Sequence, residues 1–409
     1  MARLDEIHRL VEAEMAGLPV ETHDCSEGLP LQAVGFGAAE VNAAIDCMVT
    51  TWVTMGRRVR AFEAQWAEYC RASHGIMCNS GSSANLLMLA ALLETGRLQR
   101  GDEVLVPAVG WSTSLFPIAQ VGLVPVLVDI DDTLCIDVAA AARAMGPRTK
   151  AALPVHLLGQ PADVVGLEAL GLLVAEDACA APGAERDGRR AGSMGVAGTF
   201  SFFYSHHLTT VEGGIVVCRD EELANAARSC RAHGWVRERT DKADLVAASP
   251  EIDERFLFVS AGWNLRPTEM AGAMGSEQLK RLPAWIERRR QNHADWCELL
   301  AETNGVRVFP EPAGHVHTAF AFPLLLEGTL DRASVMAHLE SRGIQTRPIS
   351  GSNLARQPAF ERVPGARVAG SLEMADRIHT HGLFVGSSHA FGRGHGLLLR
   401  EALEEAING

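Results

Sequence analysis

The chain has 409 residues, a hydrophobic content of 47% and a formal net charge of −13 at pH 7. This length predicts one large domain with a smaller one, and the acidic balance argues against nucleic acid as a partner, because phosphate contacts need clustered lysine and arginine. No apolar run reaches the roughly 18 residues of a membrane span, and the first residues lack the order of a signal peptide. The nine cysteines are scattered singly. We therefore expect a cytoplasmic protein with reduced thiols and no role in a membrane.

Residues 1–35 predict an N-terminal helix, because apolar residues recur at helical spacing from Leu4 to Val11, and then a connector rich in proline and glycine. From residue 36 to 280, short apolar runs alternate with helical patterns. The runs lie at 74–78, 103–107, 125–130, 151–156, 172–177, 198–203 and 214–218. This alternation predicts a large α/β domain with a seven-stranded, mainly parallel sheet that binds ligands at the carboxyl ends of its strands.

Residues 281–409 predict a second, smaller α/β domain. Strands are expected at 306–309, 319–325 and 343–348, and helices near 332–341 and 372–378. A long helical region from about residue 269 to 302 connects the two domains and carries a basic run, Glu287-Arg-Arg-Arg290. We interpret this run as a solvated helix face, since charged runs on helices usually face water.

Three features at predicted strand ends suit a ligand site. Asn79-Ser-Gly-Ser-Ser-Ala-Asn85 opens a helix, where backbone N–H groups and the helix dipole favour phosphate, although an ordinary serine N-cap explains the pattern equally well. Asp177 ends an apolar strand and suits a metal, a general base or the partner of a protonated ring nitrogen, but no ligand spacing supports a metal. Trp111 lies at the same edge and suits stacking on a planar ring, with core packing as the alternative.

A turn with two adjacent histidines, His206 and His207, follows the strand 198–203. Apolar residues flank the turn and a glycine pair opens the next strand, so we expect it to be held rigidly at the ligand edge of the sheet. The imidazole pKa of about 6.5 makes these residues candidates for proton transfer near pH 7.

Six motifs in this order resemble those of the DegT/DnrJ/EryC1/StrS family of fold-type I pyridoxal phosphate enzymes, over about residues 35–390. They begin at Asn79, Pro107, His156, Glu176, Ser201 and Gly262. The resemblance implies an aspartate aminotransferase-like fold, a pyridoxal or pyridoxamine 5′-phosphate cofactor and a homodimer with shared active sites.

The resemblance also assigns roles to single residues. It implies that Asp177 keeps the pyridine nitrogen of the cofactor protonated and that Trp111 stacks on the ring. It implies that the phosphate is held by Gly81, Ser82 and Ser201, with Asn264 contributed across the dimer interface.

The departure from the family pattern lies in the histidine turn. Aminotransferases of the family carry a lysine there that forms a Schiff base with the cofactor, whereas this chain has His206. Its lysines are Lys150, Lys242 and Lys280, and none lies in a comparable turn. The substitution resembles the sugar 3-dehydratase branch of the family, which implies that His206 moves a proton while a nucleotide-linked 4-keto-6-deoxyhexose loses its C3 hydroxyl.

The remaining expectations concern the co-substrate and the substrate contacts. Beyond Cys230 the chain has only Cys297, too few ligands for an iron–sulfur cluster, so we expect an amino donor such as glutamate to restore pyridoxamine phosphate. His207 and Arg347 are candidate substrate-binding residues, with a turn-stabilising histidine and a surface arginine as the alternatives. Two other functions stay open, namely a different elimination or a transamination on a related keto-sugar, and a cofactor-binding paralogue without turnover.

Overall fold

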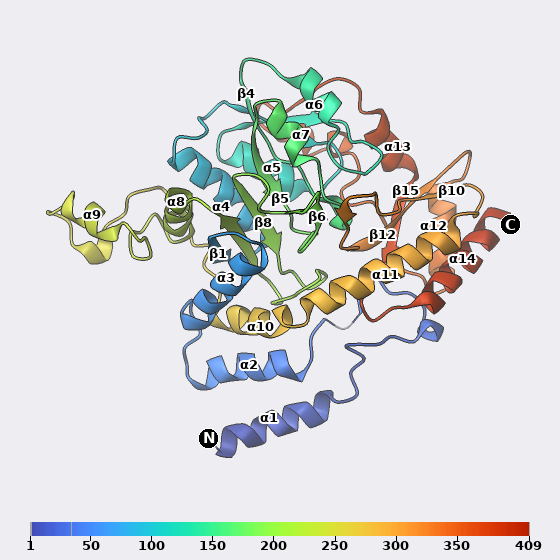
Figure 1. Cartoon of the computed structure of the whole chain (residues 1–409), viewed down its shortest axis with the longest axis horizontal. Helices are drawn as coiled ribbons and strands as arrows, with labels where there is room; N and C mark the ends of the chain where they lie inside the picture. Colours follow the sequence, from blue (N-terminus) through green and yellow to red (C-terminus); the bar gives the residue numbers. More distant parts are fainter. Residues whose placement is uncertain (1, 34, 409) are drawn as a thin grey trace.

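The computed structural model describes residues 2–33 and 35–408 and is drawn in Figure 1. Its strands form an eight-stranded sheet, a four-stranded sheet and a three-stranded sheet. Helices surround the large sheet, and the long helix α11 (Leu282–Leu300) runs from its side toward the small C-terminal sheet (Figure 1). The proposed division into residues 1–35, 36–280 and 281–409 stays a prediction.

The large sheet contains all seven predicted strands, in the order β1-β9-β8-β5-β4-β2-β3-β14. Their bounds are β1 (His74–Cys78), β2 (Glu103–Pro107), β3 (Val124–Val128), β4 (Thr149–Ala152), β5 (Leu173–Asp177), β8 (Ala197–Ser201) and β9 (Gly214–Cys218), with β14 (Arg367–Val368) added from the C-terminal half. Only β9 runs against its neighbours, so the carboxyl ends of β5 and β8 meet at one edge. The mainly parallel fold-type I sheet is therefore confirmed.

Helices cover both faces of the large sheet and the outer side of the small one. Their bounds are α1 (Ala2–Met15), α2 (Ala38–Val49), α3 (Arg57–Tyr69), α4 (Gly81–Glu94), α5 (Ser112–Gln120), α6 (Val138–Ala144), α7 (Val164–Ala169), α8 (Glu221–Arg231), α9 (Lys242–Ala247), α10 (Glu269–Leu279), α12 (Arg332–Ser341), α13 (Glu373–His381) and α14 (Arg393–Asn408). The α9 excursion projects from the body of the molecule (Figure 1). None of the described helices is long and apolar enough to cross a membrane.

The small sheet has the order β10-β12-β15-β13. Its strands are β10 (Val306–Val308), β12 (Ala321–Leu326), β13 (Thr346–Pro348) and β15 (Gly382–Gly386), and the third sheet joins β6 (Glu185–Arg186), β7 (Arg189–Arg190) and β11 (His315–Val316). The inner strand β15 was not expected from the sequence. It is a five-residue apolar run that begins directly after α13, and so short a run does not distinguish a strand from the end of a helix.

The basic run on α11 is not the uniformly solvated face that we expected. Arg288 is exposed and Arg290 pairs with Glu311 at 2.8 Å, but Arg289 is only 2% exposed. Because successive residues of an α-helix are turned by about 100°, three consecutive arginines cannot share one face. The interpretation is wrong for Arg289, which turns toward the small sheet.

Candidate active site

A buried carboxylate lies at the centre of the site. Asp177 ends β5 and is 4% exposed. Its Oδ2 accepts hydrogen bonds from Asn85 Nδ2 at 2.8 Å and from Ser114 Oγ at 2.7 Å, and its Oδ1 accepts one from Cys179 N at 3.1 Å. Asn85 is oriented in turn by Thr199, whose hydroxyl lies 2.6 Å from Asn85 Oδ1. These hydrogen bonds replace the water contacts that the buried carboxylate has lost, and they leave an unused acceptor position on Oδ1.

The first turn of α4 meets the end of β8 beside this carboxylate. Ser80 caps the helix by accepting a hydrogen bond from Ser83 N at 3.1 Å. A Cβ on Gly81 would lie 2.5 Å from the Cβ and 2.8 Å from the Oγ of Ser201, so only glycine allows this approach. Ser82 follows in the same turn and is exposed. Backbone N–H groups at the helix start and two serine side chains are thus gathered where an anion would be favoured.

The two histidines of the turn differ in their surroundings. His206 is partly exposed, packs edge-on against the Phe320 ring at a centroid distance of 5.1 Å, and has no hydrogen-bond partner for Nδ1 among the described residues. His207 is buried, and its Nε2 lies 2.7 Å from Thr318 O. Because a carbonyl oxygen only accepts, His207 carries its proton on Nε2. Nδ1 of His207 likewise has no partner among the described residues, so the two rings differ in exposure and in the anchoring of His207 through Nε2.

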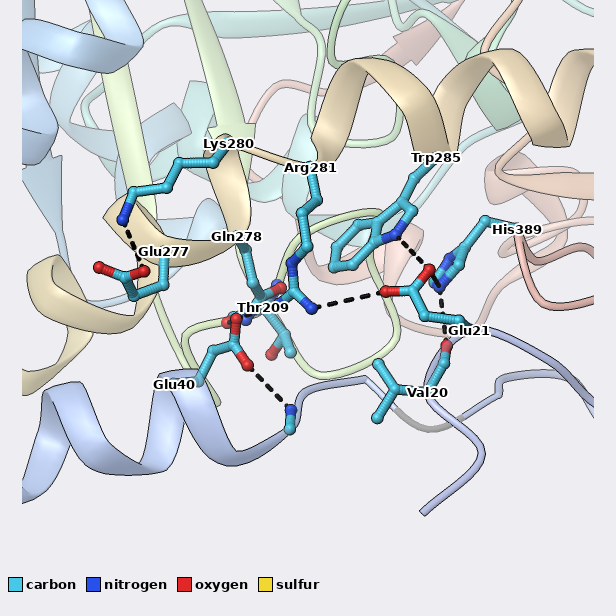
Figure 2. A network of polar contacts seen from close by, with 11 residues as sticks. Val20, Glu21, Glu40, Thr209, Glu277, Gln278, Lys280, Arg281, Trp285 and His389 are labelled. Atoms are coloured by element: carbon cyan, nitrogen blue, oxygen red, sulfur yellow. Dashed lines mark hydrogen bonds and ion pairs between the residues drawn. The ribbon is translucent and has the colours of Figure 1, made fainter. Parts of the chain in front are cut away.

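The far end of the turn is held by α10. Thr209 N donates to Gln278 Oε1 at 2.9 Å, and Gln278 Nε2 donates back to Thr209 O at 2.7 Å; both residues are labelled in Figure 2. Beside this pair, Arg281 makes ion pairs with Glu40 and Glu21 of the N-terminal region. The turn is thus tied to the junction of α10 and α11, and the expectation of a rigid turn is consistent with these contacts.

Burial sets the protonation of both histidines. It lowers the pKa of His206 from 6.5 to about 4, with the charge of Asp177 acting against this shift and that of Arg289 adding to it. Burial and Arg289 also hold the pKa of His207 well below its usual value. Both imidazoles are consequently neutral at pH 7, and His206 is able to accept a proton.

The ligand-free protein is expected to lose stability as the pH falls from about 6.5 toward 4. The folded state keeps His206 unprotonated down to about pH 4, whereas the unfolded chain takes up this proton near pH 6.5, so the free energy of unfolding decreases through this window. His206 alone accounts for up to about 3 kcal/mol by pH 4. Urea unfolding at pH 7.5, 6 and 5 measures the effect, and the His206→Asn variant should show a smaller pH dependence. A wild-type midpoint that does not change between pH 7.5 and 5 would contradict the expectation.

Trp111 starts the helix that reaches Asp177. It is the N-cap residue of α5 and is 61% exposed, and Ser114 of the following turn bonds to the carboxylate. This exposure excludes core packing as the reason for Trp111. The indole is available for stacking, but its contact with a ring stays a prediction.

Asn264 and Arg347 make no direct contact with Asp177 or His206. Asn264 is exposed and accepts a hydrogen bond from Arg266 Nε at 3.0 Å, and the next residue along its segment accepts one from Asn79 N at 2.9 Å. This contact places the Asn264 segment beside the start of α4. Arg347 is exposed on β13 and donates to Thr346 O at 2.7 Å. The roles of both residues stay predictions.

Three residues that orient Asp177 are not singled out by the sequence patterns. Of these, Asn85 carries a signal in the sequence, because it directly precedes the eight-residue apolar run 86–93 of α4, and in the structure it is fully buried. A buried amide inside an apolar helix needs a polar partner, so the pattern by itself indicates a polar site there. Ser114 and Thr199 carry no such signal, since hydroxyls are common in helices and strands.

The residues present fit a pyridoxal or pyridoxamine phosphate. The buried carboxylate of Asp177 has spare acceptor capacity on Oδ1 for a protonated ring nitrogen. The start of α4 can approach Ser201 only because Gly81 lacks a Cβ, and this approach forms a place for the phosphate. Nδ1 of His206 has no partner among the described residues. The three lysines do not compete for this site: Lys150 lies on β4 with an exposed side chain, Lys242 starts α9 and pairs with Glu254 at 3.5 Å, and Lys280 pairs with Glu277 at 2.6 Å.

Comparison with known proteins agrees with this geometry. The model of the DegT/DnrJ/EryC1/StrS aminotransferase family matches residues 36–395. The GDP-4-keto-6-deoxy-D-mannose 3-dehydratase of Yersinia pseudotuberculosis is 39% identical over 389 residues, which cover 93% of this chain and 97% of that protein.

Two solved structures of GDP-4-keto-6-deoxymannose-3-dehydratase are also similar. One is a histidine-to-asparagine variant with bound GDP-perosamine, with a TM-score of 0.87 and 35% identity over 92% of this chain and 100% of that chain. The other holds a trapped PLP-glutamate geminal diamine, with a TM-score of 0.86 and 34% identity over 92% of this chain and 100% of that chain. The chain therefore belongs to the DegT/DnrJ/EryC1/StrS aminotransferase family.

Proposed function

We propose that this protein is a pyridoxamine phosphate-dependent 3-dehydratase that removes the C3 hydroxyl of a nucleotide-linked 4-keto-6-deoxyhexose. The observation that carries the proposal is His206, which by the family resemblance takes the position of the aminotransferases' lysine, beside a buried carboxylate and a helix start that suit their cofactor. Because two similar 3-dehydratases act on GDP-4-keto-6-deoxy-D-mannose, a GDP-4-keto-6-deoxyhexose is the first substrate to test.

The residues of the site have distinct tasks in this reaction. When bound, the cofactor supplies an amine for the sugar ketone and a ring that accepts electrons during loss of the C3 hydroxyl. Asp177 would keep the ring nitrogen protonated, and Trp111 would stack on the ring. Gly81, Ser82 and Ser201 would hold the phosphate.

We assign proton transfer to His206, which is neutral, has an Nδ1 without a partner and is the more exposed histidine of the pair. It takes up a proton and returns it as the hydroxyl leaves. His207 also has an Nδ1 without a partner, but it is buried and anchored to Thr318 O through Nε2. This contact favours the role of holding the turn over direct binding of substrate, while Arg347 remains the candidate for an anionic group of the substrate or donor.

Glutamate is the proposed donor that restores the amine form, in line with the glutamate adduct in a similar structure. We also propose a homodimer in which Asn264 acts across the interface. Large apolar side chains are exposed on α2, on the loop after it and on the segment before Asn264, as expected of a surface that a partner covers. They are Met48, Val49, Trp52, Ile252, Phe256, Phe258 and Trp263. The nine free cysteines fit a reducing compartment such as the cytoplasm.

The decisive experiment incubates the purified protein with pyridoxamine phosphate, glutamate and a GDP-4-keto-6-deoxyhexose and identifies the products by mass spectrometry. We expect a 3-deoxy product that accumulates over many turnovers with glutamate and stops at about one turnover per site without it. A 4-amino sugar would instead support transamination, and cofactor binding without any product would support an inactive paralogue. A matched reaction with a CDP-linked sugar distinguishes the nucleotide.

A further inference from the structure

A short segment that leads into β12, residues 318–320, supports both histidines of the turn. Thr318 O accepts the hydrogen bond from His207, and the Phe320 ring packs against His206 and His207 at centroid distances of 5.1 and 5.7 Å. We call this part of the chain the support segment. Because it contacts both imidazoles, a shift of the support segment moves them as well.

The loop after β4 holds the support segment from one side. Thr318 N donates to Gly159 O at 3.1 Å, and Phe320 N donates to Leu158 O at 3.0 Å. Between these bonds Ala319 has a φ of 46°, in the left-handed region. A residue with a Cβ adopts this conformation only where its surroundings impose it, so the support segment is held in one particular shape.

Arg289 of α11 holds the support segment from the other side. Its Nη1 donates to Ala319 O at 3.2 Å and to Phe320 O at 3.4 Å, and also to Ser387 O, which follows β15. The side chain is almost fully buried, and none of the carboxylates in the described residues pairs with it. Burial lowers the pKa of its guanidinium to about 9, so the group is still charged at neutral pH. A buried cation without a carboxylate is costly and calls for an explanation.

The charged and titratable groups that face His206 come from two elements. Asp177 at the end of β5 favours the protonated imidazole, whereas burial and Arg289 of α11 disfavour it. The two charges therefore act on His206 in opposite directions, and Arg289 offsets the carboxylate that the cofactor site requires.

His207 is surrounded by groups that all disfavour its protonated form, apart from one carbonyl. Burial, Arg289, His206 and His389 lower its pKa, and the hydrogen bond to Thr318 O raises it. His317 is the other titratable neighbour, and burial holds its pKa well below the usual value too. Arg289 is thus the permanent cation beside a group of neutral imidazoles.

We propose that Arg289 is a positioning residue for His206: it clamps the support segment against the histidine turn and presents a buried, unpaired positive charge to the imidazoles. The clamp fixes where the His206 ring lies, and the charge lowers the proton affinity of that ring, so that a proton it takes up is readily returned. The expected effect of Arg289 on kcat rests on the proposed dehydratase function, whereas its contacts with the support segment do not. The geometry itself belongs to the ligand-free protein and is testable there.

Three variants separate this role from that of a simple structural tie. Arg289→Met removes the charge and the donors but keeps an unbranched chain, and Arg289→Lys keeps the charge but loses the planar fork. Arg288→Met is the matched control, because it removes the same charge from the exposed neighbour on the same helix. Thermal unfolding first establishes that each variant is folded.

The first readout is the pKa of His206 in the ligand-free protein, from NMR spectra of protein labelled with ¹⁵N-histidine and assigned with a His206→Asn variant. Arg289→Met is expected to raise this pKa by about one pH unit, whereas Arg289→Lys and Arg288→Met leave it near the wild-type value. A purely structural tie would change the pKa only through the hydration of the ring, and would not leave it at the wild-type value in Arg289→Lys while raising it in Arg289→Met. A folded Arg289→Met variant with an unchanged His206 pKa would overturn the proposal.

The second readout is turnover of the nucleotide sugar. Arg289→Met is expected to lower kcat about 10- to 100-fold, with Arg289→Lys between it and wild type and with KM changed by less than about threefold. If Arg289→Met does not fold, the test is made with Arg289→Lys. In that case an Arg289→Lys variant whose kcat equals that of Arg288→Met would overturn the proposal. If the wild type turns over no sugar, the dehydratase function fails, and the NMR readout still tests Arg289.

Discussion

Replacing His206 by asparagine is expected to lower kcat for 3-dehydration by about 10²–10⁴-fold, because an amide cannot take up and return a proton. Asparagine keeps a polar group of similar reach next to Phe320, so the affinity for pyridoxamine phosphate should change little. Product formation by mass spectrometry and cofactor titration by fluorescence measure the two effects separately. A variant that keeps more than about a tenth of the wild-type kcat would contradict the role of His206 as the proton carrier.

A His206→Lys variant is the complementary control. It restores an amine at the position where aminotransferases of the family carry one, and we expect a covalent bond to pyridoxal phosphate with a visible absorbance band that borohydride removes. The wild-type protein should show no such band, since Lys150 is exposed on β4 and Lys242 and Lys280 pair with Glu254 and Glu277. A borohydride-sensitive band in the wild type would mean that another amine reaches the site.

Replacing Asp177 by asparagine is expected to lower kcat by about 10²–10³-fold and to weaken cofactor binding. The carboxylate accepts from Asn85 and Ser114 on one oxygen and from Cys179 N on the other. An amide in the same place must turn its NH₂ toward one of these sets of donors, so it leaves a buried donor without an acceptor. It also cannot neutralise a protonated ring nitrogen.

Ser114→Ala is the matched control for Asp177→Asn. It removes one donor to the carboxylate but keeps the negative charge, so we expect a loss in kcat of about tenfold, the usual effect of one hydrogen bond to a charged group. Cofactor titration and thermal unfolding of both variants complete the comparison. Wild-type cofactor affinity and turnover in Asp177→Asn would show that the carboxylate does not hold the ring.

The seven strands of the large sheet were predictable because each is an apolar run bounded by turn residues, and runs of this kind are recognised locally. The strand β15 was not predictable, because its five residues follow α13 without a loop and no local pattern separates them from the helix. The eighth strand β14 has two residues and is defined only by its pairing with β3. Such strands form by pairing with strands that are distant in the sequence, and a local sequence pattern carries no information about that pairing.

The residues of the site also fall into a group that local motifs predict and a group that they do not. The positions of Gly81, Asp177 and Ser201 at strand and helix ends follow from motifs, since a motif is a local property. The partners that orient them do not, because Asn85 and Asp177 are 92 residues apart and His207 and Thr318 are 111 apart. Their pairing depends on how the sheet is ordered and on where the small sheet meets the large one.

The sequence by itself determined the fold class, the cofactor site motifs and the absence of a lysine in the histidine turn, because these depend on residue identity and short-range pattern. Only the tertiary structure decided that His206 stays partly exposed while His207 is buried and donates a hydrogen bond from Nε2 to Thr318 O. It also decided that Arg289 points inward, where a basic run suggested solvent. The reason is physical: burial and the charges of groups far away in the chain set the protonation of an imidazole, and both arise only when the chain is folded.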